Sequence, residues 1–135
     1  MRPHDAEKLG RMRTELAVKL GALTGVSDSR IAAQHSARQL NAEAVQLAGI
    51  RGWDARRSVG ELLETLQSDH DAMADDPRRV DTVRKIAAAM VKARAAIAAR
   101  NHADAMGQHQ TALEAEIAPL QRLVTACDAW LKEEA

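Results

Sequence analysis

The chain has 135 residues, a length typical of one domain, and balances 19 basic against 19 acidic residues. Hydrophobic residues make up 46%, yet two Trp are the only aromatic residues and 28 positions are Ala. This composition disfavours sheets, which need β-branched and aromatic runs, and the neutral charge gives no general case for nucleic-acid binding. We therefore expect an all-α antiparallel helical bundle of about five helices, as a single domain over residues 1–135.

The first part of the chain, residues 1–50, predicts two helices in an antiparallel hairpin. Apolar residues recur at steps of three and four over 5–23, which is the period of an amphipathic helix. Gly25 is expected to end this helix, because glycine weakens a helix interior. A second stripe of small and apolar residues predicts a helix over 29–48, which Gly49 closes in the left-handed conformation.

Residues 54–135 are expected to form a three-helix part. Asp54 is a candidate N-cap for a helix over 54–74. The sequence Asp-Asp-Pro then ends this helix, and the central helix follows over 79–100. The apolar stripe predicted on that central helix consists of Val80, Val83, Ala87, Met90 and Ile97.

The last segment predicts one long helix over 103–133, after a break near Asn101. Seven apolar residues stay on one seam across Pro119: Met106, Leu113, Ile117, Leu120, Val124, Cys127 and Leu131. A proline inside a helix removes one hydrogen bond and kinks it. We expect a single helix kinked at Pro119, with two helices split near Ala118 as the alternative. Part of this seam is expected to project beyond the other helices and to need cover from a second chain.

Charge is distributed in blocks of opposite sign. Residues 1–60 carry a net charge of +4 and residues 61–76 carry −6, whereas residues 77–100 carry +6 and the remainder −4. This order predicts that the acidic block folds beside the basic central helix. The alternative is that the basic helix binds nucleic acid.

No motif indicates an enzyme, a cofactor or a tight metal site. Glu-x-x-His and His-Glu-x-x-His are absent, as is a Gly-rich phosphate loop, and Cys127 is the only cysteine. A surface metal site would have to use His70, His102 and His109, and ordinary surface histidines are the preferred interpretation. The polar N-terminus and the lack of an 18-residue apolar run predict a cytoplasmic protein without a membrane span.

Two short stretches resemble known families. His35 and Arg38 have the spacing of the exposed His and the basic residue in histidine phosphotransfer domains, which are helical bundles. Residues 39–41 are Gln-Leu-Asn, where that family has small residues and Gly. The resemblance implies a phosphotransfer role for His35, as an alternative function.

The run ARNHADAMGQHQTALEA is similar to the turn and second helix of a tetratricopeptide repeat. Ala105 and Ala112 fall where that repeat has two small residues, whereas His102 and His109 replace its large aromatics. No second copy occurs at the repeat's period of 34 residues. The resemblance therefore implies a local helix–turn–helix geometry and not a peptide-binding solenoid.

What remains is a non-enzymatic protein that contacts other proteins or itself, in the manner of a coiled coil or helical bundle. Trp and Arg are enriched among the interface residues that contribute most of the binding free energy. The alternative for Trp53 is that it covers the start of the helix that follows it. The alternative is a nucleic-acid-binding regulator that uses the loop arginines, including Arg51, Arg78 and Arg79. The candidate contact residues are Trp53, Arg56, Arg57, Leu120, Val124, Trp130 and Leu131.

Overall fold

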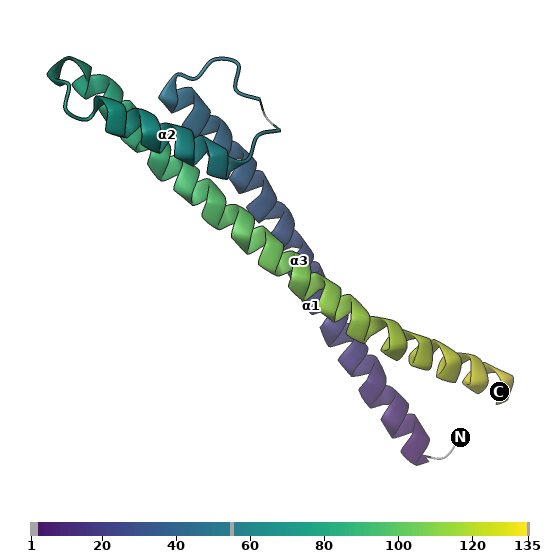
Figure 1. Ribbon diagram of the computed structural model, residues 1–135. Helices are drawn as coiled ribbons and strands as arrows, with labels where there is room; N and C mark the ends of the chain where they lie inside the picture. The colour runs from purple at the N-terminus through teal and green to yellow at the C-terminus, as the bar shows by residue number, and fades with distance from the viewer. Residues whose placement is uncertain (1–2, 55, 135) are drawn as a thin grey trace. The chain divides into compact units, whose positions relative to one another are not determined.

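The computed structural model describes residues 3–54 and 56–134, the side chains of residues 3, 4 and 134 excepted. Its elements are α1 (Pro3–Ala48), α2 (Val59–Met73), the 3₁₀ turn η1 (Pro77–Arg79) and α3 (Val80–Glu134) (Figure 1). The described residues contain no strand, which confirms the all-α prediction. The count of about five helices is wrong, because these residues form three α-helices and one 3₁₀ turn.

The hairpin predicted within residues 1–50 is replaced by one 46-residue helix. Gly25 does not end it, and its φ is not positive, unlike that of Gly49 and Gly52. A glycine inside a helix costs only about 1 kcal/mol relative to alanine, which packing along a long helix can offset. Thr24 also fits the helix, because its Oγ1 donates to the carbonyl of Leu20 at 3.1 Å.

Gly49 closes α1 as predicted. Its φ is +68°, and its N–H donates to the carbonyl of Gln46 at 3.1 Å. The N–H of Ile50 donates to the carbonyl of Val45 at 3.3 Å. These two bonds make a Schellman motif, which satisfies the last carbonyls of the helix and needs a left-handed residue at Gly49.

α2 begins at Val59, five residues later than the predicted cap at Asp54. Ser58 is the N-cap, since its hydroxyl accepts from the backbone N–H of Glu61 at 3.1 Å. Asp54 instead forms a local turn, where its carboxylate accepts from the backbone N–H of Arg56 at 2.9 Å. Both residues are good caps, and the one adjacent to the apolar stripe of α2 is used.

α3 continues where the sequence predicted a break, and it begins at Val80 as one 55-residue helix. The apolar pattern lapses near Asn101 only when large residues are counted, because Ala103 is buried and continues the seam. The turn implied by the tetratricopeptide resemblance is therefore absent from this stretch of α3. Pro119 lies inside the helix, so the unsplit helix is confirmed, while a kink there stays a prediction.

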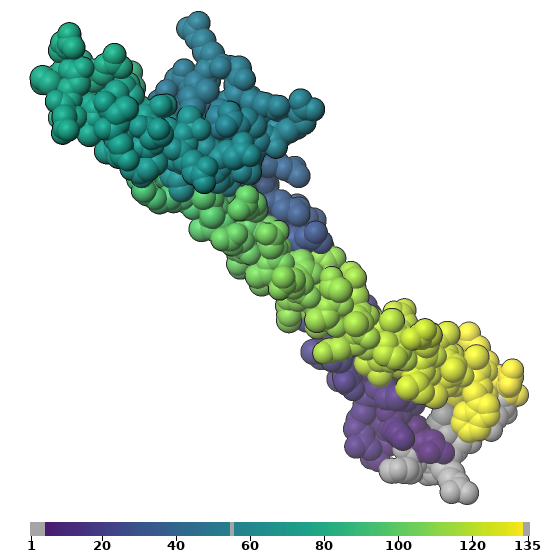
Figure 2. Space-filling model, viewed as in Figure 1, coloured from purple at the N-terminus to yellow at the C-terminus, as the bar shows by residue number. Residues whose placement is uncertain are grey.

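Contacts between residues divide the chain into two units, to which both long helices contribute. The second unit, Ile31–Asp104, packs α2 against segments of α1 and α3. Its core includes Leu62 and Leu66 of α2 together with Ile86 and Met90 of α3. In the space-filling view the teal α2 covers part of the green α3 in this unit (Figure 2).

Alanine forms much of the buried face of α3 in the second unit. Ala89, Ala93 and Ala96 are each at most 1% exposed, whereas Val80, expected in the apolar stripe, is 46% exposed. The predicted stripe is therefore right at Met90, which is 5% exposed, and at Ile97, which packs against the core, but wrong at Val80. It gave more weight to large side chains than to the alanines, which lie where neighbouring helices approach most closely.

The first unit, Met1–Arg30 with Ala105–Ala135, contains one segment each of α1 and α3. Arg13 pairs with Asp128, Lys19 Nζ lies 2.8 Å from Glu116 Oε2, and Arg30 donates to Gln110 Oε1 at 3.3 Å. Residue numbers rise on one helix as they fall on the other, so the two segments are antiparallel. The Arg30 side chain lies against Gly107. A Cβ added to Gly107 would be 3.3 Å from Arg30 Nε.

The acidic α2 and the basic start of α3 do lie together, but through apolar contacts. Among the described residues, no ion pair joins the two helices themselves. Asp76 pairs with Arg79 at 3.5 Å in the connecting turn, and Lys92 of α3 pairs with Glu43 of α1 at 3.0 Å. The two oppositely charged helices therefore pack together through apolar side chains, without an ion pair between α2 and α3 among the described residues.

Candidate contact surface

The seven candidate residues fall into two groups. Trp53, Arg56 and Arg57 belong to the loop between α1 and α2 in the second unit. The other four, Leu120, Val124, Trp130 and Leu131, lie on α3 in the first unit.

Trp53 and Arg57 are engaged by their own unit. Trp53 is half-buried and packs against the core, and the Arg57 guanidinium lies 4.1 Å from the centre of its ring. The same guanidinium donates to Glu61 Oε2 at 2.9 Å. These contacts favour the covering role of Trp53 over a partner contact, because the face of the indole ring already contacts the cation and the ring packs against the core.

Arg56 and Arg78 also have nearby carboxylates. Arg56 Nε lies 3.3 Å from Asp54 Oδ1, and the pKa of Asp54 is lowered, first by the backbone N–H of Arg56 and then by its side chain. At the other end of α2, Asp76 accepts from the backbone N–H of Arg78 at 3.0 Å, which lowers its pKa in the same way. Exposed pairs of this kind are weakly bound, so the arginines remain available to other anions.

The loop arginines do not form one basic patch. Arg57 precedes α2 and Arg78 follows it, with 15 helical residues between them. At 1.5 Å per residue this separation is about 22 Å. A nucleic-acid surface built from both groups would have to span that length, which includes the acidic residues of α2.

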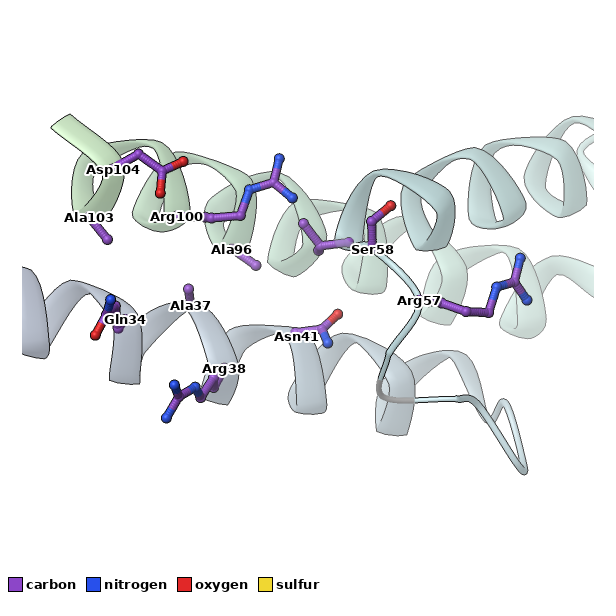
Figure 3. Close-up of a pocket in the computed structure, with 11 residues that line it drawn as sticks. Gln34, Ala37, Arg38, Asn41, Arg57, Ser58, Ala96, Arg100, Ala103 and Asp104 are labelled. Atoms are coloured by element: carbon purple, nitrogen blue, oxygen red, sulfur yellow. The ribbon is translucent and has the colours of Figure 1, made fainter. Parts of the chain in front are cut away.

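The second unit has an open hollow of about 330 Å³ between α1, α3 and the start of α2. Ala37, Ala96 and Ala103 lie along it, with arginines and Asp104 at its edge (Figure 3). Figure 3 shows Arg100 extended toward the start of α2, while Arg57 points away from the hollow. Guanidinium groups could hold an anion here, but they do not converge on one point.

The seam on the last part of α3 is covered within the first unit. Val124 is 8% exposed and Ile117 is 6% exposed, while Leu120 and Leu131 are half-buried. The sequence predicted this seam correctly. The α1 segment of the same unit contributes to this cover, and contact of these residues with a second chain stays a prediction.

Trp130 lies outside that cover and is 45% exposed. It borders an apolar groove of about 290 Å³ between the two helices of the first unit, which we call the Trp130 groove. Leu123, on the same side of α3, is 53% exposed. The groove is lined by Asp5, Lys8, Leu9, Met12, Leu123, Cys127 and Trp130.

Sequence reasoning missed Leu123 as a member of this surface and placed Cys127 on the main seam with Val124. Leu123, Cys127 and Trp130 are spaced by four and three residues, which places them along one side of a helix. The main seam passes through Val124 and Cys127, so this second stripe shares Cys127 with it and adds Leu123 and Trp130 at its side. A search for a second stripe flanking the first would have found it from the spacing alone.

Charged residues lie on the lining of the groove and farther along its two helices. Lys19 and Glu116 lie farther along the same two helices, and their hydrogen bond raises the pKa of Lys19 and lowers that of Glu116. Asp5 and Lys8 lie on the lining itself. The surface therefore combines an apolar floor with one acidic and one basic residue at its edge, as protein interfaces commonly do.

The histidines do not gather into a site within the described residues. No group of three or more potential His, Cys, Asp or Glu metal ligands occurs there. His35 is exposed on α1, and His70 Nδ1 lies 3.6 Å from Asp71. None of the described helices is long and apolar enough to cross a membrane.

In comparisons with known proteins, no family model, no curated protein and no solved structure matches this chain. Its most distinctive surface feature is the Trp130 groove, where two large apolar side chains remain in contact with solvent.

Proposed function

We propose that this chain is a non-enzymatic protein–protein contact module that binds through the Trp130 groove. The observation that carries the proposal is the exposure of Trp130, at 45%, beside an apolar groove. Tryptophan is among the residues whose burial contributes most to binding. Burial of its apolar ring against a partner removes the ring from water and so lowers the free energy of the complex.

The contrast between the two units supports this surface. Among described residues of the first unit, only Leu9, Ile117 and Val124 are buried hydrophobic residues, whereas eleven are buried in the second. The second unit has α2 as a third helix to cover its apolar faces. Two helices alone bury one stripe each, so flanking apolar residues of the first unit stay accessible to a partner.

Affinity capture tests the proposal. The purified full chain is immobilised, and proteins of the source cells that it retains are identified by mass spectrometry. We expect at least one protein, another copy of the chain included, to be lost when Trp130→Ala and Leu123→Ala are combined. Truncation of an interface anchor typically costs 2 kcal/mol or more, about a 30-fold loss of affinity.

Val18→Ala is the matched control. Val18 is 67% exposed on the same helical pair but does not line the groove. Its removal should leave the retained proteins unchanged, and circular dichroism should show that all variants stay folded. Identical sets of retained proteins for the chain and the double variant would refute the proposed contact surface.

A further inference from the structure

The partner of the Trp130 groove can be inferred from the arrangement of its side chains, on the basis of the proposed function. On α3 a small residue, Cys127, stands between two large ones, with Leu123 four residues before it and Trp130 three residues after. This order is nearly the same read in either direction. When two such stripes run antiparallel, the large residue of one faces the large residue of the other across the small centre.

The groove also has both halves of a self-complementary contact. Leu123 and Trp130 protrude, while Leu9, Met12 and Cys127 line the recess beside them. A twofold contact uses the same patch on both copies, so that patch has to carry the protruding part and the recess together. A patch built for a different partner has no such requirement.

Charge permits the same arrangement. The lining carries one acid, Asp5, and one base, Lys8, so two copies of it do not meet as like-charged surfaces. The lining extends over residues 5–12 of α1 and 123–130 of α3, about 12 Å along each helix at 1.5 Å per residue, so it forms the centre of the contact.

We propose that a second copy of this chain occupies the Trp130 groove, with the two α3 helices antiparallel about Cys127. Leu123 of each copy then packs against Trp130 of the other. The two Cys127 side chains face each other near the twofold axis. The reduced protein is a non-covalent dimer, and the thiols are only a built-in marker of its geometry.

Crosslinking at Cys127 tests this geometry. The reduced full chain is oxidised with copper phenanthroline under air over a range of protein concentrations. Two thiols form one disulfide, releasing two protons and passing two electrons through copper to oxygen. A disulfide needs Cα atoms within about 7 Å of each other. Since Cys127 is the only cysteine, any disulfide-linked dimer joins the two Cys127 residues.

We expect a covalent dimer whose yield rises with concentration together with the mass of the reduced protein in sedimentation. Moving the thiol to an exposed site of α3 outside the groove, in Cys127→Ser/Thr125→Cys, is the control. It should slow crosslinking at least tenfold while the non-covalent dimer persists. Trp130→Ala should raise the dissociation constant at least tenfold.

Two results would overturn the second copy as the partner. One is a reduced chain that stays monomeric at high micromolar concentration, and the other is equally fast crosslinking through Thr125→Cys. If affinity capture still depends on Trp130 in either case, a different protein occupies the groove and the proposed function stands. If capture is also independent of Trp130, both proposals fail.

Discussion

Replacing Leu62 by alanine is expected to lower the free energy of unfolding by about 2–5 kcal/mol. Leu62 is fully buried in the core of the second unit, at 0% exposure, among side chains of α2 and α3. The substitution removes apolar contacts and leaves a cavity that the surrounding helices fill only in part. Urea denaturation followed by circular dichroism measures the loss.

The neighbouring leucine provides the control for this substitution. Leu63 lies on the same helix and is only half-buried. Leu63→Ala therefore deletes the same atoms at the same helix propensity, with less area returned to water. Equal losses for Leu62→Ala and Leu63→Ala would contradict the position of the core.

Replacing Ala93 by leucine is expected to destabilise the protein by about 1–3 kcal/mol, although leucine forms helices nearly as well as alanine. Ala93 is 0% exposed where α3 meets its neighbours, so a larger side chain has no space. Thermal unfolding should show a lower midpoint for Ala93→Leu. Ala95 is exposed and lies two residues later, on the opposite side of α3. Ala95→Leu should therefore change the free energy of unfolding by less than about 0.5 kcal/mol.

A midpoint for Ala93→Leu equal to that of Ala95→Leu would mean that the alanine face is not a close helix contact. The pair is informative because composition, helix propensity and the type of substitution are the same. Only the surroundings of the two alanines differ.

The sequence was sufficient for the helical class and for most buried faces. The stripe of α2 through Leu62 and Leu66 follows from spacing alone, as does the seam through Ile117 and Val124. The cap at Gly49 was also predictable, because only a left-handed residue closes a helix with that hydrogen-bond pattern.

The helix boundaries were not predictable, since local signals compete with tertiary packing. Gly25 is a helix breaker by propensity, yet it lies within α1. Asn101 follows an apparent lapse in the pattern, yet buried Ala103 continues the face. Counting alanine as a contact residue would have corrected the second error, and nothing local would have corrected the first.

The candidate surface was found only in part, for a related reason. Trp130 was conspicuous as one of two aromatic residues. Leu120, Val124 and Leu131 were chosen from the main seam, which α1 of the same chain covers. Exposure is decided by which helix lies alongside, and the period of a single helix does not contain that information.

The central claim is that a partner covers Trp130, and quenching of its fluorescence by acrylamide tests it most directly. Trp53→Phe leaves Trp130 as the only tryptophan and keeps an aromatic ring at the core contact of Trp53. We predict strong quenching in dilute solution, consistent with 45% exposure, and progressive protection as the protein concentration rises or a captured partner is added. Quenching that is the same at every concentration and with every captured partner would contradict the claim.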